Sequence, residues 1–191
     1  MGRTSKKITV NLMDPKSFRR GSMSLKDYRQ HLLDKCYEFV IALSEKGVEV
    51  ARLRTNDGYR QYIAFGYDAK KLRSGVAQSI LYAQQTGVIT SVWMTSGGVS
   101  GVKVADVSPL LMAEFGAGVA HDKNPKAHRH GMGAGTFPDQ THAFDKGGWW
   151  YQDLDGEWHH TDGIEPTMPM YRTALYLQML VVSTARRIFN T

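Results

Sequence analysis

The stretch TMPMYRTALYLQMLVVSTARRIF, residues 167–189, decides the fold class of this chain. Thr167 precedes Pro169, and a capping hydroxyl followed by a proline in the first turn is the usual order at a helix N-terminus. Arg186 and Arg187 stand near the other end, where cations favour the helix dipole. Apolar residues mark one helical face at Met170, Ala174, Leu177, Val181, Ala185 and Ile188. The stretch therefore predicts a C-terminal helix with one buried face.

A second amphipathic pattern begins near residue 24. Ser24 and Asp27 have the spacing of a capping box, which predicts a helix start there. Gly47 is expected to interrupt or end this helix. The alternation from Val48 to Arg54 fits either a continued helix or a strand. The apolar residues at helical spacing are Leu25, Tyr28, Leu32, Cys36, Phe39, Val40 and Leu43.

The segment between the two helices is rich in β-forming residues and turn signals. Pro109 predicts a short helix that Gly116 stops. The other expectations are a strand over 59–67, a helix or strand over 76–83, and a hairpin from 88–94 and 99–107 around Ser96-Gly97-Gly98. Together these elements predict an α+β fold, in which a small antiparallel sheet is packed by a long N-terminal and a C-terminal helix.

Residues 97–163 form a glycine-rich excursion that ends in an aromatic hairpin. They hold twelve of the nineteen glycines, which disfavours regular helix and predicts a long loop. Within GGWWYQDLDGEWHHTDG, Trp149 and Trp150 fall on alternate faces of one strand, and the chain returns through Trp158 after a turn. The three tryptophans fit either a core or a partner surface, where Trp is enriched.

The charge of the chain is concentrated near its N-terminus. The 191 residues carry a formal net charge of +6, and residues 1–30 alone hold eight Lys or Arg against two acids. Residues 1–23 lack a sustained apolar period, so we expect a basic flexible arm before a single domain over 24–191. Residues 139–165 hold seven acids against one lysine. Such asymmetry steers contacts with nucleic acid or with an acidic surface of a neighbouring copy.

Signs of catalysis, cofactor binding or membrane insertion are weak. We find no nucleophile elbow, zinc-protease pair or phosphate-binding loop, and Cys36 is the only cysteine, so we expect no cofactor and no enzymatic activity. Asp153 and Asp155 flank the predicted hairpin tip, where carboxylates usually form turns. No stretch reaches the roughly 18–20 apolar residues of a membrane span. His128 and His130, with His121 or Asp122, are candidates for a metal site.

The order of these elements resembles the neck and tail-completion proteins of long-tailed phages, a family described as minor tail components that join heads to tails. The resemblance covers residues 24–189. It rests on Glu114-Phe115-Gly116-Ala117-Gly118, where the family usually has Thr in place of Ala117, on the Gly148-Trp149 hairpin, and on the proline-started helix from Pro169.

The resemblance implies an architectural function in the virion. It implies a hexameric or dodecameric ring between the head-closure or connector proteins and the tail terminator or tail tube protein. Arg19 and Arg20 of the arm would then meet a neighbour's acidic segment, a connector protein or DNA in the lumen. The expected assembly contacts are Arg19, Arg20, Trp149, Trp150, Trp158, Asp153 and Asp155.

Two other functions stay open on the residues alone. The first is a metal-dependent DNA-binding or nuclease-like protein that uses His121, His128 and His130. The second is a small nucleic-acid-binding module whose basic arm contacts phosphates. Metal content would distinguish the first, and salt-dependent DNA affinity the second.

Overall fold

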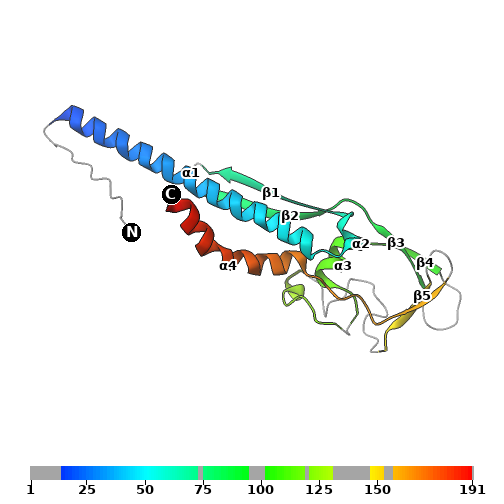
Figure 1. Ribbon diagram of the computed structural model, residues 1–191. Helices are drawn as coiled ribbons and strands as arrows, with labels where there is room; N and C mark the ends of the chain where they lie inside the picture. Colours follow the sequence, from blue (N-terminus) through cyan, green and yellow to red (C-terminus); the bar gives the residue numbers. More distant parts are fainter. Residues whose placement is uncertain are drawn as a thin grey trace.

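The computed structural model describes residues 14–72, 75–94, 102–118, 121–130, 147–152 and 157–190. These parts form an elongated body in which α1 runs along most of the length (Figure 1). The elements are α1 (Pro15–Arg54), α2 (Asp57–Arg60), β1 (Ile63–Lys71), β2 (Ala77–Gln85), β3 (Ile89–Met94), β4 (Val102–Val107), α3 (Pro109–Phe115), the 3₁₀ turn η1 (Ala127–His130), β5 (Trp149–Gln152), β6 (Trp158–Thr161) and α4 (Pro169–Phe189). The predicted α+β class, with its N-terminal and C-terminal helices, is confirmed.

Helix α1 begins nine residues before the predicted start at Ser24. The Asp14 carboxylate accepts a hydrogen bond of 3.0 Å from the Lys16 amide, and Pro15 occupies the first helical position. Residues 15–23, expected in a flexible arm, are therefore the first turns of a helix; residues 1–13 lie outside the described part. With 40 residues, α1 is about 60 Å long.

Gly47 does not end α1, contrary to the sequence prediction. A Cβ atom at Gly47 would lie 3.0 Å from a methyl carbon of Leu81 on β2 and 3.1 Å from one of Leu177 on α4. Gly47 thus lets α1, β2 and α4 approach one another closely. The ambiguous segment after Gly47 is a continued helix, since α1 runs to Arg54.

Strands β1 and β2 form an antiparallel ribbon that lies along α1. Their register pairs Ile63 with Gln85 and Lys71 with Ala77. The ambiguous segment 76–83 is thus a strand, and the strand predicted over 59–67 begins only at Ile63, after the short helix α2. The Ser44 and Ser79 hydroxyls share a 2.7 Å hydrogen bond that ties α1 to β2.

The core lies where α1, β1 and α3 meet. Ala51, Ile63, Phe65 and Ala113 are buried together there. Val48, Tyr59, Ala83, Leu110 and Met170 pack around them. Burial raises the pKa of the Tyr59 phenol. The core therefore lies near the C-terminal end of α1, and the first turns of α1 extend away from it on one side while β3 to β6 extend away on the other (Figure 1).

Two further antiparallel ribbons form the other end of the body. Strands β3 and β4 pair from Ile89 with Val107 to Met94 with Val102, as the sequence predicts. Strands β5 and β6 pair from Trp149 with Thr161 to Gln152 with Trp158, so the aromatic hairpin is confirmed. The described strands make three separate two-stranded ribbons. Most of the glycine-rich loop lies outside the described residues.

Helix α4 packs antiparallel to α1 with a face slightly different from the predicted one. Thr173 and Ile188 are buried, whereas Ala174 and Val181, expected inside, are exposed. The inner face of α4 is the one that faces α1. Helix α4 lies against α1 for much of its length (Figure 1). Phe189 ends α4 beside Phe39 of α1, with ring centroids 6.1 Å apart.

Candidate assembly surfaces

The buried side chain of Glu114 caps α4 from a distant part of the sequence. It stands in α3 and is 8 % exposed. Its carboxylate oxygens accept hydrogen bonds of 2.9 Å from the amides of Met170 and Tyr171 in the first turn of α4. The Asn124 side-chain amide donates to the same carboxylate at 2.8 Å. A negative charge at this position complements the positive end of the helix dipole.

Thr167 does not cap α4, contrary to the sequence prediction. Met168 occupies the capping position with a left-handed backbone, φ 52°, and gives no side-chain cap. Thr167 instead directs its hydroxyl to the carbonyl of Ala113, 3.4 Å away, and the Met168 amide donates to the same carbonyl at 2.9 Å. The end of α3 therefore holds the beginning of α4 through both main-chain and side-chain contacts.

Glycines let the chain after α3 pass close to the chain after β6. Ala117 and Ile164 exchange main-chain hydrogen bonds of 2.9 and 2.8 Å. Gly116 has a φ of 67° and Gly163 a φ of 117°. A Cβ at Gly163 would collide with the carbonyl oxygen of Ala117. The motif behind the family resemblance thus joins α3, α4 and the β5–β6 hairpin at one place, which we call the junction.

The face of α1 that contacts α4 continues beyond the end of α4. Leu32, Tyr28 and Leu25 precede Phe39 by 7, 11 and 14 residues, spacings that return to about the same side of a helix. Their exposed fractions are 43, 57 and 59 %. We call these three residues the α1 stripe. The sequence predicted them as part of a half-buried face, and no described residue covers them as α4 covers Phe39.

Cations are in excess on the part of α1 that carries the stripe. Arg29 adjoins the stripe on the side of the β1–β2 turn, where its guanidinium lies close to Gly75, whereas Lys26 is turned away from the stripe. Arg19 and Arg20 are exposed nearer the start of the helix. The Arg20 guanidinium lies 4.0 Å from the Asp14 carboxylate and is 80 % exposed, so this contact contributes little. Among residues 15–35, Asp27 and Asp34 are the acids, and Asp34 pairs with Lys71 at 2.5 Å.

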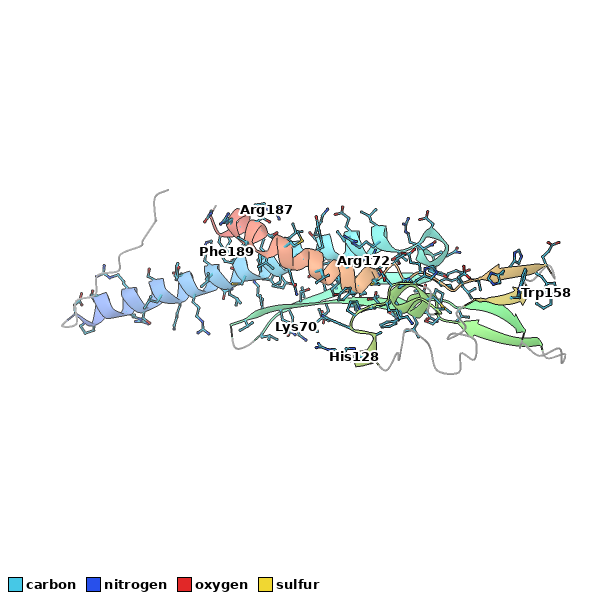
Figure 2. All side chains as sticks on the ribbon, turned by 90° about the horizontal axis from the view of Figure 1, so that it is seen from below. Lys70, His128, Trp158, Arg172, Arg187 and Phe189 are labelled. Atoms are coloured by element: carbon cyan, nitrogen blue, oxygen red, sulfur yellow. The ribbon has the colours of Figure 1, made fainter. Side chains whose placement is uncertain are left out.

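The β5–β6 hairpin presents an aromatic face at the other end of the molecule. The register places Trp150, Trp158 and His160 on one side of the ribbon. Trp150 and Trp158 are 58 and 50 % exposed. The Trp150 and His160 rings meet edge to face with centroids 5.1 Å apart, and His160 Nε2 lies 2.9 Å from the Gly147 carbonyl oxygen. Figure 2 shows Trp158 at the extremity opposite the N-terminal part of α1.

The predicted contact residues therefore divide between two ends of the body. Arg19 and Arg20 lie on α1, far from the hairpin that carries Trp150 and Trp158 (Figures 1 and 2). Trp149 takes part in β5, but its side chain is not among those described. Asp153 and Asp155 lie outside the described residues. The acids described near the hairpin are Glu157, Asp162 and Glu165, all exposed.

The described residues do not assemble the predicted metal site. No three His, Cys, Asp or Glu side chains come together within the described part of the chain. His121 is half-buried and His128 is exposed in η1 (Figure 2). His130 ends η1, and its side chain is outside the description. Of the described helices, none is both long and apolar enough to cross a bilayer.

A shallow groove lies between α1 and α4. It has a volume of about 500 Å³ and includes Glu45, Lys46, Glu49 and Arg187 in its lining. Lys46 forms a 2.7 Å ion pair with Glu49 in this groove, and the hydrogen bond from Lys46 to Glu49 raises the pKa of Lys46. Both partners are largely solvated, as in an ordinary surface pair.

Comparison with known proteins returned no matching family, no curated relative and no similar solved structure.

Proposed function

We propose that this chain is a structural virion protein of a tailed phage. It forms a homo-oligomeric ring in the neck, between the head connector and the tail, and completes the tail for joining to the head. The proposed neighbours are a head-closure or connector protein on one side and a tail terminator or tail tube protein on the other. DNA passing through the lumen is a further proposed contact.

The observation that carries this proposal is the exposed α1 stripe. Three large apolar side chains lie open on a helix face that α4 covers only from Phe39 onward. Exposed apolar surface of this kind marks a site of protein contact. The order of elements that resembles neck proteins points the same way. The motif Glu114–Gly118, which carries part of that resemblance, joins α3 to the start of α4 and to the chain after β6.

The test is to disrupt the reading frame in its phage, restore it from a plasmid, and count particles by negative-stain electron microscopy. We expect filled heads beside unattached or malformed tails without the protein, and normal particles after wild-type complementation. Normal infectious virions without the protein would overturn the proposal and redirect attention to metal content and nuclease activity.

A charge-reversed chain makes the test specific to α1. We expect Arg19→Glu/Arg20→Glu to leave heads and tails unjoined, because the projecting part of the helix loses its positive surface. The matched control is Arg52→Glu/Arg54→Glu, the same change at the other end of α1, where both residues are also exposed. Joining by the first variant at the wild-type level would remove these two arginines from the mechanism.

A further inference from the structure

We propose that the α1 stripe of one copy binds the Trp150–Trp158 face of the β5–β6 hairpin of a second copy. This inference rests on the proposed function, since it identifies the contact between neighbouring copies in the ring. The observations behind it are the placement of the two surfaces, their apolar side chains and their opposite charges.

The placement of the two surfaces requires two molecules. The α1 stripe lies toward one end of the elongated body, and the aromatic hairpin forms the other end (Figures 1 and 2). Within one copy the stripe and the hairpin cannot meet. Between two copies they meet head to tail, and such a heterologous contact forms a closed ring when the rotation between copies closes.

The apolar side chains of the two surfaces match in kind and extent. Leu25 to Leu32 span about 11 Å along α1, and the four residues of β5 span about 13 Å. Trp150 and Trp158 stand on one face of the ribbon, where they can cover Leu25, Tyr28 and Leu32 together. Tryptophan is enriched among the residues that contribute most to binding at the centre of an interface.

The charges around the two surfaces are opposite. Arg29 adjoins the α1 stripe, Lys26 lies on the same turns of the helix, and the stretch from 15 to 35 holds more bases than acids. The described residues from 147 to 165 hold three acids and no Lys or Arg. Asp162 extends a side chain that is 65 % exposed. This complementarity favours the hairpin of another copy as the partner of the α1 stripe. The outer side of α4 is a poorer partner, because α4 carries basic residues and no acid.

The test uses the full chain and two sets of substitutions. The first chain, Leu25→Ser/Tyr28→Ser/Leu32→Ser, lacks the stripe, and the second, Trp150→Ser/Trp158→Ser, lacks the aromatic face. Sedimentation velocity measures the assembly of each alone and of a mixture. Circular dichroism checks that each chain is folded. The control is Leu53→Ser, because Leu53 is exposed on α1 but far from the stripe.

We expect the wild type and the control to form oligomers and each blocked chain alone to remain monomeric, with self-association weakened by about 30-fold or more. The mixture forms one-to-one heterodimers and nothing larger, because the second chain still has a stripe and the first still has a hairpin face. A wild type that stays monomeric at every concentration, or blocked chains that assemble like the wild type, would overturn the inference.

A charge exchange distinguishes a second copy from DNA as the partner. Lys26→Glu/Arg29→Glu should weaken self-association about 10-fold or more, and adding Asp162→Lys/Glu165→Lys to the same chain should restore it. Arg52→Glu/Arg54→Glu is the control. If the first pair of changes leaves self-association intact and abolishes binding to a double-stranded DNA fragment, the basic surface serves DNA and the inference fails.

The outcomes separate this contact from the function itself. If the purified protein forms head-to-tail oligomers in solution but the disrupted phage still makes normal virions, the proposed function is wrong and the proposed contact between copies stands. If the disrupted phage makes unjoined heads and tails and the stripe-deficient chain restores joining fully, the proposed contact is wrong and the proposed function stands.

Discussion

Replacement of Glu114 by alanine is expected to destabilise the protein strongly. The change removes a buried carboxylate that accepts hydrogen bonds from the amides of Met170 and Tyr171 and from Asn124. A lost helix cap costs about 0.5–2 kcal/mol, and each buried donor left without an acceptor costs about 1–3 kcal/mol. Water that enters the vacated space offsets part of this cost.

The expected loss for Glu114→Ala is about 3–4 kcal/mol in the free energy of unfolding. In a chain of 191 residues this lowers Tm by roughly 6–16 °C. Glu114→Gln keeps the shape and one acceptor oxygen but removes the charge, so it should lose about 1–2 kcal/mol. Urea unfolding followed by circular dichroism measures both variants.

The matched control is Glu49→Ala, which removes a solvated carboxylate paired with Lys46 on the surface of α1. It should change the free energy of unfolding by less than about 1 kcal/mol. A Glu114→Ala protein as stable as this control would refute the assignment of Glu114 as the cap that holds α4.

Three further changes test other contacts. Gly163→Ala should cost about 2–3 kcal/mol because its φ is 117° and a Cβ meets a main-chain oxygen, whereas Gly147→Ala, in open space, should be neutral in the same thermal melts. Phe189→Ala should cost about 1–2 kcal/mol through its lost ring contact; urea unfolding at wild-type stability would contradict this. The Lys71 hydrogen bond holds the pKa of Asp34 below its ordinary value of 3.8, so the pair stabilises the fold above that pH and the benefit is lost as pH falls through the lowered pKa. Asp34→Asn should therefore be less stable than wild type at neutral pH and equal to it in strong acid, and a difference that persists in acid would disprove the pairing.

Local patterns in the sequence predicted the elements whose signals are themselves local. The β3–β4 and β5–β6 hairpins have clear turn residues between β-forming runs, and both pair as expected. Pro109 and Gly116 mark the two ends of α3. The start of α1 also has a local signal, Asp14 before Pro15, but the basic residues around it suggested an arm.

The remaining errors concern contacts between distant parts of the chain. Glu114 lies 56 and 57 residues from the amides that it caps, so no spacing rule relates them, and Thr167 offered a nearer but wrong cap. Gly47 has the usual signature of a helix end, yet packing against Leu81 and Leu177 keeps it inside α1. The exposure of the α1 stripe depends on where α4 ends in space, which periodicity does not encode.

The helical geometry of α1 also determines which insertions and deletions keep the α1 stripe on its original side. Each residue added to its projecting part lengthens it by 1.5 Å and turns everything before that point by 100°. A change of seven residues keeps the stripe nearly on its original side and moves it by about 10.5 Å, whereas a change of two turns it to the opposite side. Chains that share this architecture are therefore expected to vary the length of this segment in steps of about seven or eleven residues, so that neighbouring copies change their spacing without changing the side on which they meet.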